Sequence, residues 1–288
     1  MSDKLHNAIE RMRMASEISL EHYQKPILLT YSGGKDSDVC IEVAKIAGIP
    51  FEVVNSHTTA DAPETVRHIR KKFQELELAG IPCRIQYPEY KGNRVSMWTL
   101  IPQQGMPPTR FTRYCCAVLK ETAGNSRAIV TGVRWAESIR RKNTRGIAET
   151  ITRDPKKKIM LLSDDDDGRR LIEQCQQKAK TVFNPVIDWE DAEVWDFLRE
   201  RQVETNPLYR CGFDRVGCVG CPMAGRKKRL FEFARYPAYK TMYIHAFDRM
   251  LKAIKADGKE TKWESGRDIF RCWMEENPDQ LLFEGMED

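Results

Sequence analysis

The sequence predicts an α/β fold, in which a parallel sheet carries helices on both faces and a helical region follows at the C-terminal end. Short apolar runs rich in β-branched residues alternate with stretches of helical periodicity between residues 26 and 187. A glycine-rich turn directly follows the first of these runs, and beyond Trp189 the helical patterns dominate. Strands that alternate with helices favour parallel pairing, because each crossover returns the chain to the same edge of the sheet.

The individual elements follow from these runs. We expect strands at residues 26–31, 51–55, 83–87, 128–132 and 182–187, and helices at 36–47 and 62–78. We expect the chain to divide into an N-terminal helix, an α/β domain and a helical C-terminal region, over residues 1–24, 25–190 and 191–288. Residues 32–37, 56–61 and 132–141 each follow a strand. They should therefore converge on one cleft, because ligands of parallel sheets bind at the carboxyl ends of the strands.

The composition is typical of a soluble globular protein. The 288 residues are 41% hydrophobic and 31% charged, and no apolar run approaches the roughly 20 residues that span a bilayer. The N-terminal segment is amphipathic and lacks the apolar centre of a signal peptide, so we expect a cytoplasmic protein with no membrane partner. A net charge of +5 suits an anionic substrate as well as nucleic acid, and does not decide between them.

The most informative stretch of the chain is Tyr31, Ser32, Gly33, Gly34, Lys35, Asp36 and Ser37. The two glycines let backbone N–H groups approach an anion, and the helix that follows adds the positive end of its dipole. The two serines offer hydroxyl donors, and Lys35 can neutralise phosphate charge. The spacing excludes both a Walker loop and a GxGxxG loop. A plain glycine-rich turn that caps a helix is the alternative.

Nine cysteines in a cytosolic chain are read as free thiols or metal ligands rather than disulfides. Four of them stand out by their spacing: Cys115, Cys116, Cys218 and Cys221. A C-x-x-C turn is a common metal-thiolate half-site, whereas two adjacent thiolates converge poorly on one tetrahedral zinc ion. A [4Fe–4S] cluster tolerates that divergence, so we favour it over zinc; four unrelated buried thiols are the alternative. Arg110, Arg113 and Lys120 flank the first pair and would offset the charge of a thiolate cluster.

Three further features have two readings each. The basic run Arg226, Lys227, Lys228 and Arg229 either faces a nucleic-acid backbone or begins a solvated helix. Residues 153–170 are charge-dense and include four consecutive aspartates. They form a mobile flap, a metal-binding patch or, as we favour, a solvated surface excursion. Cys211 lies near the C-x-x-C pair and is either a sulfur carrier at the cluster edge or a packed side chain.

Taken together, the motifs resemble the phosphoadenosine phosphosulfate reductase superfamily, from about residue 26 to about residue 225. The Ser-Gly-Gly-x-Asp-Ser loop resembles that of the PP-loop ATP pyrophosphatases. The other segments that carry the resemblance are residues 57–65, 131–141, 184–195, 206–209 and 217–218. The four-cysteine set is similar to that of the assimilatory adenylyl-sulfate reductases and of the DndC- and SspD-type proteins of DNA phosphorothioation.

The resemblance implies a Rossmann-like, HUP-type fold whose loop grips the pyrophosphate part of Mg-ATP while the α-phosphate is attacked. It implies that ATP is bound by Ser32, Gly33, Gly34, Lys35, Asp36, Ser37 and Gly132. It implies catalytic roles for Lys35, Asp36, Arg134 and Arg140, with Arg141 as the alternative to Arg140. It also implies that the four spaced cysteines hold a [4Fe–4S] cluster.

Two departures from the reductases favour ATP cleavage. The sequence has no Glu-Cys-Gly-Leu-His motif at its C-terminal end, and its PP-loop is intact where reductases usually carry a degraded one. We therefore predict an ATP pyrophosphatase that forms AMP and pyrophosphate and activates an acceptor, DNA backbone, for sulfur insertion. Its sulfur donor would be a cysteine desulfurase. The alternatives are a sulfonucleotide reductase that forms sulfite, a tRNA thiolation enzyme and a non-enzymatic nucleotide sensor. Asn206 stands where the family usually has His.

Overall fold

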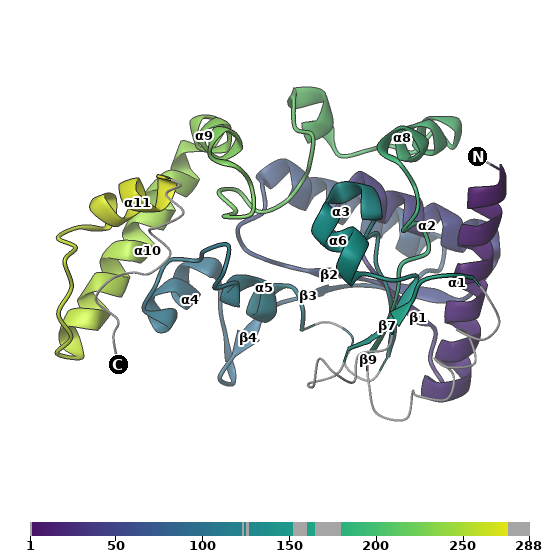
Figure 1. Cartoon of the computed structure of the whole chain (residues 1–288), viewed down its shortest axis with the longest axis horizontal. Coiled ribbons are helices and arrows are strands. Elements are labelled where there is room, and N and C mark those ends of the chain that lie inside the picture. Colours follow the sequence, from purple (N-terminus) through teal and green to yellow (C-terminus); the bar gives the residue numbers. More distant parts are fainter. Residues whose placement is uncertain (1, 123, 125–126, 152–159, 165–179, 276–288) are drawn as a thin grey trace. The chain divides into compact units, whose positions relative to one another are not determined.

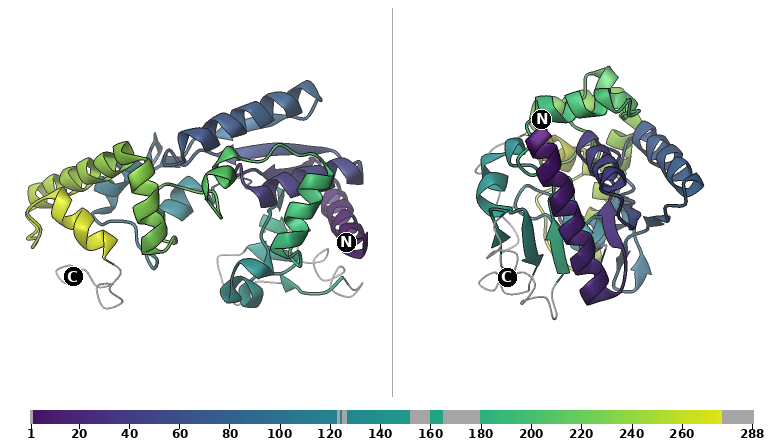
Figure 2. Two further views of the ribbon diagram at one scale, coloured as in Figure 1. Left: turned by 90° about the horizontal axis from the view of Figure 1, so that it is seen from above. Right: turned by 90° about the vertical axis from the view of Figure 1, so that its right-hand side faces the viewer.

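The computed structural model describes residues 2–122, 124, 127–151, 160–164 and 180–275, and the chain divides into two compact units (Figures 1 and 2). Unit 1 comprises Met1–Asn55, Pro63–Gln86 and Ala123–Val216. Unit 2 comprises Ser56–Ala62, Tyr87–Thr122 and Gly217–Asp288. The three-part division expected from the sequence stays a prediction.

Unit 1 is built on a seven-stranded sheet with the strand order β3-β2-β1-β6-β9-β7-β8. The strands are β1 (Ile27–Thr30), β2 (Phe51–Ser56), β3 (Cys83–Gln86), β6 (Ala128–Val130), β7 (Ala148–Ile151), β8 (Met160–Leu161) and β9 (Lys180–Phe183). β1 pairs in parallel with β2 and β6, and β6 pairs in parallel with β9. This confirms the predicted parallel sheet, and the order places β1, with its glycine-rich turn, in the middle of it.

Two strands of this sheet escaped the sequence analysis. β7 pairs antiparallel with β9 and with β8, so one edge of the sheet is antiparallel. Both strands are short: β7 precedes the charge-dense stretch, and β8 lies within it in an apolar run of four residues. The strand predicted at 182–187 begins earlier and ends at Phe183. Its predicted second half is a turn, in which the Ile187 N–H donates to the Asn184 carbonyl at 3.2 Å.

The helices of unit 1 are α1 (Ser2–Tyr23), α2 (Lys35–Ala47), α3 (Pro63–Leu78), α6 (Ile139–Thr144) and α8 (Asp191–Glu200), with short 3₁₀ turns η1 (Trp135–Glu137) and η4 (Pro207–Cys211). The predicted helices at 36–47 and 62–78 are thereby confirmed to within one residue at their starts. α1 and α2 pack against each other and against β1 (Figure 1). The strand residues Ile27, Leu28 and Leu29 are fully buried, so the turn that follows them begins from a well-packed strand.

Unit 2 is helical, with α4 (Met97–Gln104), α5 (Tyr114–Leu119), α9 (Arg226–Arg235), α10 (Pro237–Ala256) and α11 (Gly266–Met274), and has a small hairpin of β4 (Glu89–Tyr90) and β5 (Asn93–Arg94). α10 packs against α4 and α11. Its core is aromatic. The rings of Tyr243, Phe247 and Trp273 lie 4.9 to 6.1 Å apart, in tilted and edge-on pairs. Aromatic pairs of this geometry add to the free energy gained from burying their area.

The basic run at the start of α9 is only partly a surface feature. Arg226 and Lys227 are exposed, but Arg229 is 2% exposed, and its guanidinium lies 3.9 Å from the centroid of the Trp273 ring. Its Nη1 also donates to the Trp273 carbonyl at 3.1 Å. The prediction that all four basic residues face a nucleic acid is therefore wrong for Arg229, because its side chain stabilises the aromatic core instead.

The charge-dense stretch at 153–170 lies outside the described residues except for 160–164. Within that short segment, Asp164 forms an ion pair with Arg11 of α1 at 2.6 Å. Among the described residues, no helix combines the length and apolar character needed to cross a membrane.

Candidate functional site

The glycine-rich turn between β1 and α2 has a backbone that other residues would not adopt. Gly33 has φ +72°, and a Cβ at this position would lie 2.9 Å from Cγ1 of Ile69. Ser37 Oγ donates to the Gly34 carbonyl at 2.7 Å and so braces the first turn of α2 across the loop. The loop that the sequence singled out is thus a tight, braced turn at the N-terminus of a 13-residue helix. Backbone N–H groups and the helix dipole favour an anion at such a place.

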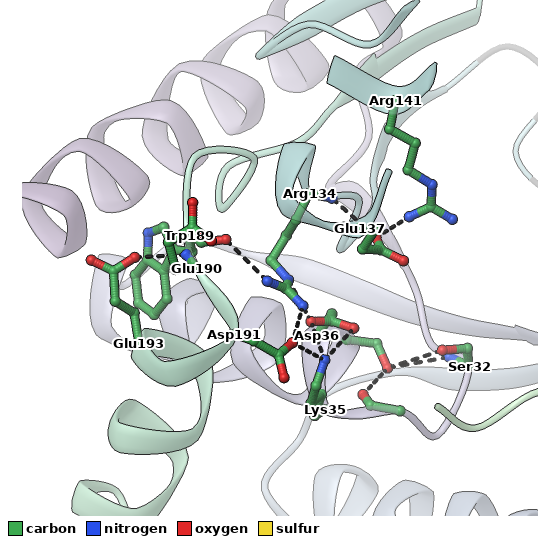
Figure 3. A network of polar contacts seen from close by, with 12 residues as sticks. Ser32, Lys35, Asp36, Arg134, Glu137, Arg141, Trp189, Glu190, Asp191 and Glu193 are labelled. Atoms are coloured by element: carbon green, nitrogen blue, oxygen red, sulfur yellow. Dashed lines mark hydrogen bonds and ion pairs between the residues drawn. The ribbon is translucent and has the colours of Figure 1, made fainter. Parts of the chain in front are cut away.

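Two cations and two carboxylates meet beside this turn (Figure 3). The Arg134 Nε lies 2.7 Å from Asp36 Oδ1, and its Nη2 lies 2.7 Å from Asp191 Oδ1. The Lys35 ammonium lies 2.9 Å from the same Asp191 oxygen and 3.3 Å from Asp36 Oδ1. Lys35 and Arg134 are both buried, so their charges act in a medium that screens them weakly. The structure therefore brings together three of the four predicted catalytic residues.

Asp191 is the member of this group that the sequence analysis missed. It is the first residue of α8, where an acidic side chain is ordinary because it favours the helix dipole, so its type carried no signal. Partial burial alone would raise its pKa. Hydrogen bonds from Lys35 and Arg134 and their positive charges outweigh that effect, and the pKa of Asp191 lies below its ordinary value.

Gly132, predicted to contact the nucleotide, has a visible structural reason to be glycine. A Cβ at this position would lie 2.7 Å from the carbonyl oxygen and carbonyl carbon of Asp36. The loop after β6 therefore touches the backbone at the start of α2, and no flexible side chain is available to give way. This contact fixes the distance between the loop that carries Arg134 and the helix that carries Asp36.

Arg140, the fourth predicted catalytic residue, is exposed on α6 and is not part of the group around Lys35. Its neighbour Arg141 lies closer: its guanidinium pairs with Glu137, which also accepts from the backbone N–H of Arg134 at 3.2 Å (Figure 3). Burial, together with the nearby charges of Arg215 and Arg145, lowers the pKa of Arg141 to about 10. The catalytic role proposed for Arg140 fits the position of Arg141 better.

A segment far along the chain covers the PP-loop. Asn206 is fully buried, and its Nδ2 donates to the Gly33 carbonyl at 3.0 Å and lies 3.2 Å from Thr65 Oγ1. The Tyr209 hydroxyl accepts a hydrogen bond from the backbone N–H of Lys35 at 2.9 Å. Asn206, whose role was in doubt from the sequence, therefore holds the backbone of the loop with its amide.

A second buried group joins the two ends of the PP-loop. The Tyr31 hydroxyl, just before the loop, donates to Asp38 Oδ1 at 2.9 Å and lies 3.1 Å from His68 Nε2 of α3. Burial raises the pKa of Asp38 to about 7 and lowers the pKa of His68 to about 4. The hydrogen bond between Tyr31 and Asp38 holds the strand end and the helix start together, which stabilises the loop between them.

The four spaced cysteines all belong to unit 2. Cys115 and Cys116 lie on the short helix α5. Cys218 and Cys221 lie in the turn before α9, where the Cys221 N–H donates to the Cys218 carbonyl at 3.3 Å. A bridge between Asp61 and Cys218 ties this turn to the segment after β2.

The surroundings of these thiols shift their pKa values in opposite directions. The neighbouring Cys116, burial and the charges of the other thiols raise the pKa of Cys115. Hydrogen bonds from Cys115 and Arg113 and the charge of Lys120 outweigh the effect of burial and hold the pKa of Cys116 below its ordinary value. Burial raises the pKa of Cys218 to about 12, although Lys120 opposes this. The negative charge of Cys218 is also the largest cause of a raised pKa at Lys120. Cys115 interacts electrostatically with the other three thiols, and Lys120 interacts with Cys116, Cys218 and Cys221, so these side chains lie in one neighbourhood.

In the part of the chain that the structure describes, no group of three or more His, Cys, Asp or Glu side chains is arranged so that it could hold a metal ion. Whether the cysteine group suits a metal cluster is therefore judged from its donor atoms and from the charges beside them. Four thiols with Arg113 and Lys120 beside them form a donor set that suits an iron–sulfur cluster, whose net charge is negative. Cys211, weighed as a sulfur carrier, is exposed at the end of η4 in unit 1.

The sequence pattern of the phosphoadenosine phosphosulfate reductase domain matches residues 26–224, which is more than half of the chain. The chain belongs to this family. The matched region contains the PP-loop, the Arg134 segment, the Asn206–Tyr209 segment and all four spaced cysteines, so the resemblance drawn from the motifs is confirmed at the level of the superfamily. A closer relationship to the DndC-type proteins stays a prediction.

Similar proteins include reductases and uncharacterized proteins. The chain is 29% identical to chloroplastic 5′-adenylylsulfate reductase 1 of Arabidopsis thaliana, over 78% of this chain and 44% of that protein. It is 27% identical to adenosine 5′-phosphosulfate reductase of Allochromatium vinosum, over 69% of this chain and 68% of that protein. An uncharacterized protein of Methanocaldococcus jannaschii is 26% identical, over 80% of this chain. The chain covers 47% and 44% of the lengths of the first two curated relatives that it matches, which is less than half of each.

Solved structures are similar at lower identity. The phosphoadenylyl-sulfate reductase of Candida auris matches with 17% identity and a TM-score of 0.47, over 74% of this chain and 88% of that chain. A U34-tRNA thiolase of Methanococcus maripaludis, solved with its [4Fe–4S] cluster, matches with 14% identity and a TM-score of 0.42, over 86% of this chain and 78% of that chain. Both TM-scores are below 0.5, so the family rests on the sequence match alone.

Proposed function

We propose that this protein cleaves ATP to AMP and pyrophosphate and uses the reaction to activate an acceptor for sulfur insertion. One observation carries the proposal: the buried cations Lys35 and Arg134 both point to a single oxygen atom beside an intact PP-loop. Two buried positive charges at the N-terminus of a helix form a site for a group with several negative charges, such as the β- and γ-phosphates of Mg-ATP. Membership of a nucleotide-using family supports the same reading.

In the proposed reaction, the backbone N–H groups of Gly33 and Gly34 and the Lys35 ammonium bind the pyrophosphate part of ATP. Arg134 neutralises the charge that develops on the leaving group as an acceptor oxygen attacks the α-phosphorus. Hydrosulfide then attacks the acceptor atom that carries the adenylylated oxygen. A bond from sulfur to that atom forms, the bond from that atom to the oxygen breaks, and AMP leaves with the oxygen. Catalysis by these residues is a matter of positioning and charge, because each cation is already held in place by a carboxylate before the substrate arrives.

The cysteine group fits a [4Fe–4S] cluster by its donor set and by its neighbouring cations. Cys115, Cys116, Cys218 and Cys221 would hold the cluster, which supplies electron transfer or sulfur binding when it is present. Arg113 would stabilise it, because its Nη2 already donates to Cys116 Sγ at 3.5 Å. This assignment is independent of the ATP site and is tested separately.

The acceptor that we propose is the DNA backbone, with a cysteine desulfurase as the sulfur source. The exposed cations Arg226 and Lys227 at the start of α9 suit a phosphate backbone, although Arg229 does not take part. A tRNA acceptor would use the same chemistry. The two are distinguished by which nucleic acid gains sulfur when the protein is supplied with ATP, desulfurase and cysteine.

The decisive test is made on protein purified without oxygen. One sample receives Mg-ATP and another receives adenylyl sulfate with a reductant, and AMP, pyrophosphate and sulfite are assayed in both. We expect AMP and pyrophosphate from ATP, and a loss of at least about 100-fold in Lys35→Ala, since removing one charge-stabilising donor typically costs that much. The matched control is Lys45→Ala, an exposed lysine on the same helix that pairs with Glu42.

A second candidate is a sulfonucleotide reductase, which the names of the similar Arabidopsis and Allochromatium proteins favour. It requires a thiol nucleophile, and Cys211 and Cys272 are the candidates outside the cluster set. Sulfite from adenylyl sulfate, with ATP left intact, would reject ATP cleavage and establish this second function.

A further inference from the structure

The contacts of Asp191 differ from those of the other groups at the nucleotide site. Its Oδ1 alone is within 2.9 Å of the Lys35 ammonium and within 2.7 Å of Arg134 Nη2 (Figure 3). The side chains of Lys35 and Arg134 are 7% and 2% exposed, whereas that of Asp191 is 64% exposed. A solvent-facing carboxylate thus reaches inward to two buried cations.

The group around Lys35 is electrically balanced because of this carboxylate. Lys35 and Arg134 supply two positive charges, and Asp36 and Asp191 supply two negative charges. Of the two carboxylates, Asp36 is the more enclosed, at 23% exposure, and its backbone touches Gly132. Asp191 is the first residue of α8, so its side chain can rotate into water without breaking any hydrogen bond within the helix.

The position of Asp191 is also the position that an anion needs. The ammonium of Lys35, which belongs to the PP-loop, lies 2.9 Å from the Asp191 carboxylate and 3.3 Å from that of Asp36. A phosphate oxygen that took both cations as donors would have to replace the Asp191 oxygen, because these donors point at one atom.

We infer that Asp191 is an internal anion that occupies the pyrophosphate site of the PP-loop and must be displaced before a polyphosphate binds. This inference rests on the proposed function, in which pyrophosphate is the group bound there. The displacement lowers the affinity for every anion by the same factor. Small ions such as inorganic phosphate therefore stay out, while a ligand with several charges and loop contacts still binds. Asp191 thus sets how tightly an anion must bind in order to occupy the site, and takes no part in the chemical step.

The test is calorimetric titration of inorganic pyrophosphate and of inorganic phosphate into the full-length protein and its variants. We expect Asp191→Asn to bind both anions about fivefold more tightly than wild type, which is the scale of a partly exposed ion pair. Asp191→Glu keeps the charge and is expected to stay within about twofold of wild type. Asp196→Asn is the matched control, because this exposed carboxylate lies on the same helix and pairs with Arg199.

Thermal unfolding supplies a second readout that does not depend on activity. Without an anion, Asp191→Asn leaves two buried cations with one carboxylate, so it should unfold at a lower temperature than Asp196→Asn. Saturating pyrophosphate should remove this difference. Asp191→Ser, which also suits the start of a helix, serves if the Asn variant does not fold.

Three results would overturn the inference. Weaker pyrophosphate binding by Asp191→Asn would show that Asp191 positions the cations rather than competing for them. An affinity equal to that of wild type would show that the carboxylate is not displaced. A failure of wild type and of every Asp191 variant to bind pyrophosphate would reject the proposed ATP site itself, and this result is distinct from the other two.

Discussion

The hydroxyl of Tyr209 accepts a hydrogen bond from the backbone N–H of Lys35 at 2.9 Å, across 174 residues of sequence. The Tyr209 ring packs edge-on against Trp195 of α8, with ring centroids 4.9 Å apart. The first N–H group of α2, which an anion at the PP-loop would otherwise use, is thus held by a side chain from η4. The loop is shaped by this contact before any ligand is present.

Replacing Tyr209 with Phe removes the acceptor and keeps the contact with Trp195. We expect Tyr209→Phe to lose about 1 kcal/mol of unfolding free energy, the usual net value of one hydrogen bond. Because the Lys35 N–H is then open to an anion, pyrophosphate should raise the unfolding temperature of the variant more than that of wild type. Tyr87→Phe, at an exposed tyrosine of unit 2, is the control. Weaker pyrophosphate binding in Tyr209→Phe would contradict this account.

Gly132→Ala tests the close approach between the loop after β6 and the start of α2. The new Cβ would lie 2.7 Å from the backbone of Asp36, and the two segments must move apart. We expect a loss of about 2 kcal/mol in unfolding free energy, as for overpacking elsewhere, together with a marked loss of ATP cleavage. Gly217→Ala, where a Cβ meets nothing within 4 Å, should leave the unfolding temperature unchanged. Equal behaviour of the two variants would show that the contact is not rigid.

The buried carboxyl of Asp38 predicts a pH dependence of stability. Its pKa in the folded protein is about 7, raised from the ordinary value of 3.8 mainly by burial. Its hydrogen bond from Tyr31 and the charge of Lys72 lower the pKa, whereas Glu42 and Asp36 raise it. Between pH 4 and 7 the folded protein keeps a proton that the unfolded chain releases. The contribution of Asp38 to unfolding free energy therefore falls as the pH rises to 7, and is flat above it.

Asp38→Asn mimics the protonated carboxyl at every pH. Relative to wild type, we expect the variant to gain about 2 kcal/mol in unfolding free energy between pH 5 and pH 8, measured by urea denaturation. His68 has the opposite effect, since its pKa is lowered by burial to about 4. The contribution of His68 to the unfolding free energy grows as the pH rises from 4 to 6.5. This contribution cancels when the variant is compared with wild type, because both proteins contain His68. A difference that does not change with pH would mean that Asp38 is ionised throughout.

The cysteine group predicts iron in protein purified without oxygen. We expect roughly four iron atoms per chain, and most of that iron should be lost in Cys116→Ala or Cys221→Ala. Cys83→Ala removes a half-buried thiol of β3 in unit 1 and should keep the iron. Zinc in wild type, with no iron and no visible absorption, would favour a single-ion site instead.

Some residues of the proposed nucleotide site could be predicted from the sequence, and others could not. The run from Ser32 to Ser37 was predictable because its residues are contiguous, and because a strand, a glycine turn and a helix are local structures. Asn206, Tyr209 and Asp191 were not, because each reaches the loop from a distant segment. The motif resemblance marked the segments that contain them, but nothing in the sequence indicated their contacts with the loop.

The two edge strands show the same limit for the fold. The central strands β1, β2 and β6 are recognisable in the sequence as continuous apolar runs, since both faces of a covered sheet are buried. β7 and β8 are short, antiparallel and close to a charged segment, so their pairing depends on neighbours rather than on their own composition. In unit 2, Arg229 was expected at the surface and lies under Trp273, because an aromatic face can accept a guanidinium.

By itself, the sequence determined the class of fold, the superfamily, the PP-loop and the four cysteines that stand apart by spacing. These features depend on residue types at short range, where backbone geometry and periodicity leave few choices. The tertiary structure alone decided that Lys35 and Arg134 share one Asp191 oxygen, that Tyr209 holds the Lys35 N–H, and that Arg141 rather than Arg140 lies near the site. Contacts of this kind depend on how distant segments pack, because an ion pair or hydrogen bond has an energy only at a particular distance.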